Sequence, residues 1–170
     1  MKKILIALLF SVFSLSSFAQ ESGTTALGLG LGLEYGGIGG RFITYPSKNV
    51  GVFGGVGSAI AGLGYNVGLQ VKFDSDKRAT GFLEAMYGYN GVIIVEGLTS
   101  ANKIYYGPSI GAGINLATRN DTGNFWHFSI LIPIRSSEFN DAWDALQNNP
   151  GIETNVLLPF TFSIGYNFKL

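Results

Sequence analysis

The chain contains no cysteine, and only 13% of its residues are charged. The absence of cysteine excludes a disulfide framework and any zinc or redox site built on thiolates. An ordinary soluble domain carries about 25% charged residues. The low charge therefore has to be explained by the environment or the packing of the chain.

Long hydrophobic runs are also missing after the first twenty residues, so the ~20-residue spans of transmembrane helices are not expected. At the start of the chain, two lysines precede an apolar stretch at 4–18, and a Ser-Phe-Ala sequence ends at Ala19. This is the layout of a secretory signal peptide. The alternative, a membrane anchor, is disfavoured because fifteen residues are too few to span a bilayer. We expect a signal peptide at 1–19 and one mature domain at 20–170.

The mature domain has little net charge. Removing the two lysines of the leader from the eleven basic residues leaves nine against eleven acidic ones, a net charge of about −2. Nucleic acid binding requires a basic face, so we expect no nucleic acid partner. Phosphate-binding glycine motifs are absent in the required strand–helix context, and we expect no cofactor and no metal.

Glycine and aromatic residues are abundant, with 25 glycines and 14% aromatics, and apolar residues alternate with small or polar ones. In the C-terminal segment 160–170, six apolar residues alternate with five small or polar residues without interruption. Soluble strands usually alternate over 4–8 residues, whereas a strand that spans a membrane needs ~9–11. This segment therefore favours a membrane-spanning strand.

The same period-two pattern returns along the chain and predicts eight strands. We expect an all-β fold, an eight-stranded antiparallel up-and-down transmembrane β-barrel. A soluble β-sandwich is the alternative, but the face opposite the apolar residues is mostly glycine, serine and asparagine rather than charged. The predicted strands are 27–35, 38–45, 50–58, 63–73, 81–89, 106–116, 126–135 and 160–170.

The connections indicate which end of the barrel faces outward. Polar turns at 46–49, 74–78 and 117–124 fall on the side of the termini, and the longest connections, 90–103 and 136–153, fall on the opposite side. The last external loop contains a helical pattern that begins near Ser137. Its apolar residues are a candidate surface for a partner, and they are Phe139, Trp143 and Leu146.

The complete pattern resembles the small OmpA/OmpX-type outer-membrane barrels over roughly residues 20–170. In that family the last strand carries alternating aromatic residues that the barrel-assembly machinery reads, and Tyr166, Phe168 and Leu170 match it, with Leu170 in place of the usual terminal Phe. The resemblance implies location in the outer membrane of a Gram-negative bacterium after signal-peptide cleavage. It implies outer-membrane lipid and the assembly machinery as partners.

The interior of an eight-stranded barrel is just wide enough for side chains to fill it. Charged residues at inward positions should pair there, because an unpaired buried charge costs several kcal/mol. We expect a network that closes the lumen, with a narrow pore for small polar solutes as the alternative. The candidate members of this network are Glu34, Arg41, Lys72, Glu84 and Arg135.

One short motif points to catalysis. His127 and Ser129 lie two residues apart on one face of a predicted strand, and the pair distantly resembles the His-x-Ser of lipid A deacylase barrels, with Glu153 as a third member. Ile130 stands where that family has Asn, and His127 should lie near the periplasmic rim and point inward. We therefore expect a structural or surface-interaction role rather than an enzyme.

Overall fold

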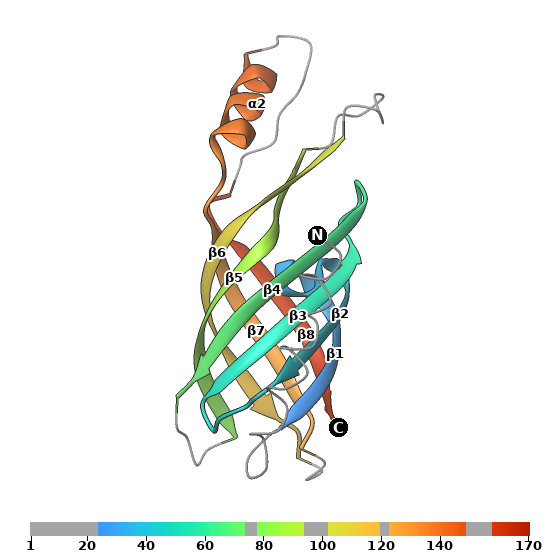
Figure 1. The fold of residues 1–170 in the computed structure, drawn as a ribbon, viewed down its shortest axis with the longest axis vertical. Coiled ribbons are helices and arrows are strands. Elements are labelled where there is room, and N and C mark those ends of the chain that lie inside the picture. The colour runs from blue at the N-terminus through green and yellow to red at the C-terminus, as the bar shows by residue number, and fades with distance from the viewer. Residues whose placement is uncertain (1–23, 74–77, 94–101, 120–122, 149–157) are drawn as a thin grey trace, which may run out of the picture.

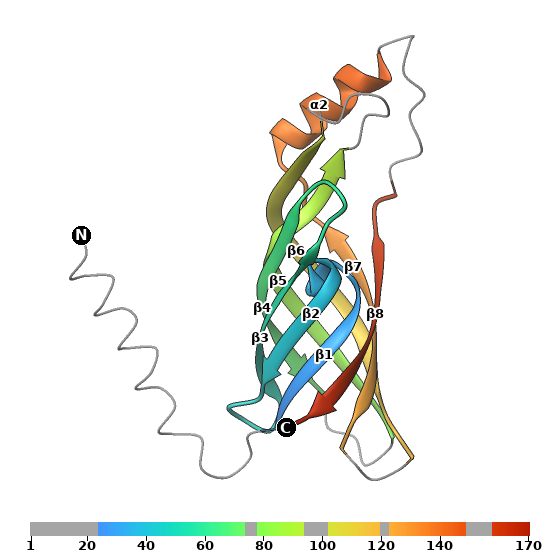
Figure 2. The same cartoon turned by 90° about the vertical axis from the view of Figure 1, so that its right-hand side faces the viewer.

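The structure is a computed structural model that describes residues 24–73, 78–93, 102–119, 123–148 and 158–170. The predicted signal peptide at 1–19 lies outside these residues. Eight antiparallel strands, arranged in chain order, form a closed barrel (Figures 1 and 2), which confirms the predicted all-β up-and-down fold. The strands are β1 (Thr25–Gly32), β2 (Gly37–Thr44), β3 (Val50–Ser58), β4 (Leu63–Lys72), β5 (Ala79–Ile93), β6 (Lys103–Ala117), β7 (Phe125–Pro133) and β8 (Thr161–Lys169).

The barrel is closed by the pairing of its first and last strands. Leu27 of β1 is paired with Phe42 of β2 on one side and with Phe168 of β8 on the other. Beyond β8, the Leu170 amide donates to the Thr25 carbonyl at 2.9 Å. Closure leaves no open sheet edge with a row of unpaired backbone groups.

The alternation in the sequence places large apolar side chains on the outer face of every strand. Leu29, for example, is 62% exposed on this face. The inner faces carry glycine, serine, asparagine and most of the buried charged groups. One such exposed side chain from each strand in turn is Leu29, Phe42, Val56, Val67, Leu83, Ile110, Ile130 and Phe162.

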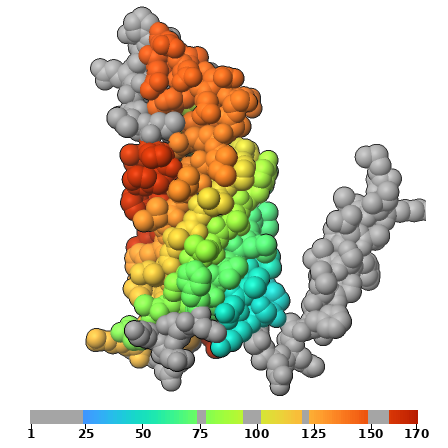
Figure 3. Space-filling model, turned by 90° about the vertical axis from the view of Figure 1, so that its left-hand side faces the viewer, coloured from blue at the N-terminus to red at the C-terminus, as the bar shows by residue number. Residues whose placement is uncertain are grey.

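The two ends of the barrel differ. β5 and β6 have 15 residues each and extend beyond their neighbours at the end opposite the C-terminus (Figure 1). The helix α2 (Ser137–Gln147) projects from the same end, as the space-filling view also shows (Figure 3). The predicted helix is thereby confirmed, and the Ser136 side chain caps it by accepting from the Phe139 amide at 3.3 Å. Among the described residues, no helix has the length and apolarity required to cross a bilayer.

The connection between β1 and β2 departs from the prediction. Residues 33–35 were expected to complete an outward-facing strand, but they form a 3-10 turn, η2 (Leu33–Tyr35), that folds into the barrel. Gly36 and Gly37 follow with φ values of 68° and 105°, a conformation that favours glycine. Tyr35, predicted to face the membrane, is fully buried as a result.

Glycines on the inner faces of the strands make room for this turn. A Cβ atom at Gly55 would collide with the Glu34 carbonyl oxygen, and one at Gly30 would lie 2.8 Å from the Tyr35 ring. At Gly165, on β8, it would collide with the Tyr35 hydroxyl. These inward-facing glycines of the alternating pattern therefore leave the space in which η2 packs inside the barrel.

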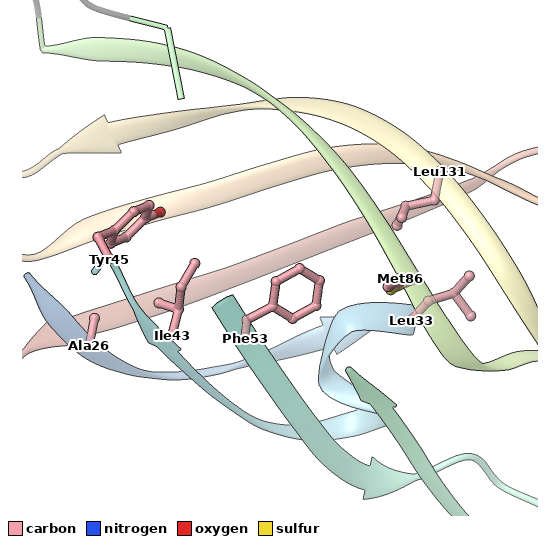
Figure 4. Close-up of a cluster of buried hydrophobic side chains, with 7 residues drawn as sticks. All are labelled: Ala26, Leu33, Ile43, Tyr45, Phe53, Met86 and Leu131. Carbon is pink, nitrogen blue, oxygen red and sulfur yellow. The ribbon is translucent and has the colours of Figure 1, made fainter. Parts of the chain in front are cut away.

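Apolar side chains fill the interior on either side of this turn (Figure 4). They come from β1, β2, β3, β5 and β7, from η2 and from the residue after β2. Phe53 and Met86, on β3 and β5, both belong to this cluster. Its members are Ala26, Leu33, Ile43, Tyr45, Phe53, Met86 and Leu131.

Candidate functional site

The candidate site lies inside the barrel and is organised around Glu34. The 3-10 turn carries this residue away from the rim, so that its carboxylate is fully buried between the strands. A buried carboxylate needs hydrogen bonds and a positive partner, because its desolvation costs several kcal/mol. The residues around it supply both.

Two side chains of β7 bind the Glu34 carboxylate. The Ser129 hydroxyl donates to Glu34 Oε1 at 2.5 Å, and His127 Nε2 lies 2.8 Å from the same oxygen. The other ring nitrogen of His127, Nδ1, lies 2.9 Å from Asn115 Oδ1. The Phe82 ring stacks on the imidazole with a centroid distance of 4.8 Å. The histidine is therefore held on both edges and on one face.

Arg41, on β2, supplies the positive charge. Its Nη1 lies 3.1 and 3.2 Å from the two ring nitrogens of His127, and its Nη2 lies 3.6 Å from Glu84 Oε2. Its guanidinium also lies 4.1 Å from the centroid of the Phe53 ring. Only 1% of the Arg41 surface is exposed. One buried cation thus lies between two carboxylates from different parts of the barrel.

The network continues from Glu84 toward the end of the barrel that holds the C-terminus. Gln70 donates from its amide to Glu84 Oε2 at 3.3 Å, and the Tyr45 hydroxyl donates to the Gln70 oxygen. All three residues are buried. A continuous chain of polar contacts therefore links Glu34 of η2 to Tyr45, the residue that follows β2.

Glu34, Glu84 and His127, which we call the carboxylate–histidine cluster, have ligand geometry suited to a metal. Each offers one ligand atom, and these atoms lie within 4.8 Å of one another. Catalytic zinc sites use three protein ligands of this kind. Here, however, the Arg41 guanidinium reaches both the imidazole and Glu84. The arrangement balances the carboxylates with a side-chain cation.

The structure brings three members of the predicted lumen network together and places the other two elsewhere. Glu34, Arg41 and Glu84 meet inside the barrel. Lys72 lies at the mouth, with its Nζ 3.6 Å from the centroid of the Tyr45 ring. Arg135 follows β7 near the base of α2, where it donates to the Leu158 carbonyl at 2.8 Å. Within the described residues, neither forms an ion pair with Glu34 or Glu84.

The residues considered for catalysis are arranged around Glu34 instead. His127 and Ser129 point inward, as the alternation predicts, and both contact Glu34 Oε1. His127 is fully buried rather than at the rim. Glu153, the proposed third member, lies outside the described residues. The Ser129 hydroxyl donates to the Glu34 carboxylate and is buried inside the barrel.

The candidate external surface is partly covered. Phe139 is 1% exposed and lies in a cluster with Ile93 and Tyr105, at the tips of β5 and β6. Trp143 and Leu146 pack against the same cluster and are half-buried. These apolar side chains therefore attach α2 to the strand extension, and the opposite, polar side of the helix is the one that solvent reaches.

The last strand presents its alternating aromatic side chains outward. Phe168 and Leu170 are exposed, and Tyr166 is half-buried. The Tyr166 ring packs against Trp126 of β7 at 5.0 Å and against Phe168 at 4.9 Å. The strand that the resemblance assigns to assembly is thus part of an aromatic group on the outer surface.

Gln70, Asn115 and Tyr45 belong to the site but were not predicted from the sequence. Gln70 and Asn115 occupy inward positions of their strands, so the period-two alternation was the signal that could have identified them.

Comparison of the chain with known protein families, with curated proteins and with solved structures finds no match in any of the three.

Proposed function

We propose that this chain is an outer-membrane β-barrel with a structural or surface-interaction role, a closed lumen and a contact surface at the α2 end. The observation that carries the proposal is the continuous apolar outer face, to which all eight strands contribute exposed large side chains. Soluble monomers rarely expose contiguous apolar patches above a few hundred Å². Lipid is the environment in which such a surface is stable.

Aromatic side chains near both ends of the outer face support this proposal. Trp126, Tyr166 and Phe168 gather toward the end that holds the C-terminus. Toward the other end, the Tyr65 and Tyr106 rings pack at 4.9 Å, and the Tyr106 hydroxyl donates to the Leu63 carbonyl at 3.0 Å. Such rings favour the two interfaces of a bilayer, where one edge is apolar and the other meets water.

The packed interior favours a closed barrel over the alternative of a narrow pore. The turn η2 crosses the interior, and Arg41, Glu34 and His127 bind one another there. Opening a path would separate a buried cation from buried carboxylates, at a cost of several kcal/mol. A role at the surface therefore fits the interior better than solute passage does.

Cell fractionation combined with heat-modifiability tests the membrane assignment. We expect the protein in the outer-membrane fraction, with an unboiled form that migrates faster than the boiled form on a detergent gel. An unshifted band in the soluble fraction would refute the proposal. In a planar bilayer, the heat-modifiable protein should give no conductance steps, and stable single-channel steps would favour the pore.

The absence of cysteine allows a direct test of orientation. Asp141 is exposed on α2, and Lys48 is exposed in the turn between β2 and β3 at the opposite end. On intact cells, a membrane-impermeant maleimide should label Asp141→Cys and leave Lys48→Cys unlabelled until the outer membrane is permeabilised. Labelling of Lys48→Cys alone would reverse the orientation and remove α2 from the cell surface.

A further inference from the structure

A cavity opens at the mouth of the barrel, at the end that holds the C-terminus. Its volume is about 220 Å³, far above the ~10–15 Å³ that one water molecule needs. Its lining comes from residues at or beside the ends of β4 to β8 and from the residues that flank β1 and β2 at this end, and we call it the vestibule. The lining residues used below are Tyr45, Lys72, Arg78, Thr80 and Lys169.

Three of these residues carry a positive charge. Lys72 places its Nζ over the Tyr45 ring, and Arg78 donates from Nε and Nη2 to the Ala117 carbonyl at 3.2 and 2.9 Å. Within the described parts of the chain, Lys72, Arg78 and Lys169 form no ion pair, and the vestibule lining contains no carboxylate. The described walls of the vestibule therefore carry positive charge and no carboxylate.

The buried network supplies no carboxylate to these walls either. Glu84, the carboxylate nearest along the polar chain, is separated from the vestibule by Gln70 and Tyr45, and it lies against Arg41. Like charges that line a concave surface with low-dielectric walls focus their field and concentrate anions. Guanidinium and ammonium groups are the side chains that bind phosphate and carboxylate oxygens most strongly.

We propose that the vestibule is a binding site for a phosphate group, either free in solution or carried by a lipid headgroup. Lys72 and Lys169 supply point charges from two sides of the mouth, Arg78 supplies guanidinium donors and Thr80 adds a hydroxyl. The site goes beyond the proposed structural role, and it is separate from the carboxylate–histidine cluster. It does not depend on the membrane topology.

Titration of the ¹⁵N-labelled mature barrel in detergent micelles with inorganic phosphate tests this inference. The Thr80 and Lys169 amide signals should shift and saturate, whereas chloride at equal ionic strength should leave them unchanged. The Lys72→Met/Arg78→Gln variant should bind phosphate at least about tenfold more weakly, because each hydrogen bond to a charged group is worth on the order of a tenfold change in affinity. Lys103→Met is the matched control, since it removes one cation at the opposite end.

Each variant is first checked for folding by heat-modifiability, and Lys72→Met alone replaces the double variant if the latter does not fold. Absence of saturable shifts, or equal weakening by Lys103→Met, would overturn the proposal. Nanodiscs distinguish the two sources. If headgroups occupy the site, phosphatidylglycerol nanodiscs should shift the Thr80 and Lys169 signals relative to phosphatidylcholine nanodiscs before any phosphate is added. If free phosphate occupies it, the two nanodiscs should respond identically to added phosphate.

Discussion

Replacing Arg41 with methionine should destabilise the barrel more than removal of any exposed charge. The substitution keeps part of the contact with Phe53 but removes the cation that approaches His127 at 3.1 Å and Glu84 at 3.6 Å. Glu34 and Glu84 would then be buried without that counter-charge. Removing one partner of a buried ion pair costs about 3–5 kcal/mol, and we expect a loss of this size in the free energy of unfolding.

Reversible urea unfolding from lipid vesicles measures this loss. The chain has two tryptophans, so a Trp143→Phe background leaves Trp126, on the outer face of β7, as the only fluorescent reporter of insertion. Lys103→Met is again the control, because Lys103 and its partner Glu138 are exposed. An Arg41→Met loss below about 1 kcal/mol, the size of an exposed pair, would refute the reasoning.

A double-mutant cycle separates the charge effect from the loss of packing. Glu84→Gln removes one of the two carboxylates, so Arg41→Met/Glu84→Gln leaves Glu34 with its His127 and Ser129 contacts. We expect the double variant to lose less stability than the sum of the single losses, with a coupling on the order of 0.5–3 kcal/mol. Additive losses would mean that Arg41 acts through packing alone.

Three further predictions concern the interior and α2. Gly165→Ala should destabilise the barrel, because its Cβ collides with the Tyr35 hydroxyl, whereas Gly40→Ala, whose nearest heavy atom would lie 3.6 Å away, should not; urea midpoints compare the two. Phe139→Ala should raise hydrogen exchange at the tips of β5 and β6, since large-to-alanine changes at buried phenylalanines cost about 3–5 kcal/mol. Unchanged exchange at these tips, together with a lower urea midpoint for unfolding of the barrel, would contradict this prediction. In Arg41→Met, zinc should restore part of the lost stability through the carboxylate–histidine cluster, and equal recovery with magnesium would argue against imidazole ligation.

Much of the fold could be predicted from the sequence because its signal is local. A strand such as β8 repeats the inside–outside alternation at every second residue, so the pattern can be read from neighbouring residues alone. The predicted bounds of β3 agree with the structure, and the helix begins at the predicted Ser137. The capping side chain of Ser136 and the apolar spacing that follows it are likewise local signals.

The site was less predictable because η2, the segment that carries Glu34, does not follow the inside–outside alternation. Leu33 to Tyr35 continue the alternation of β1 in the sequence, yet they turn inward because glycines on other strands leave space for them. That space is a property of long-range register, such as the pairing of β1 with β8, and a single strand does not encode it. The inward parity of Glu34 was nevertheless correct.

Lys72 and Arg135 illustrate a second limit. Parity predicts the face of the barrel on which a side chain lies, but not its height along the axis. Strand tilt determines that height, and it places Lys72 at the mouth and Arg135 beside α2. To predict which charges pair in a lumen, both the inward or outward parity of each residue and the stagger of neighbouring strands must therefore be known.

The inward turn also has a consequence for the order in which the barrel is made. Glu34 reaches its partners His127 and Ser129 across 93 and 95 residues of chain, and the cradle glycine Gly165 belongs to the last strand. A chain in which only β1 to β6 have formed thus lacks His127 and Ser129, the two β7 side chains that contact this carboxylate. Water is not fully excluded from the interior until the β7–β8 hairpin is added. We therefore expect the exclusion of water and the pairing of β8 with β1 to occur late, and together, in biogenesis. A chain truncated before β7 would be left with a wet, charged interior as well as an open edge.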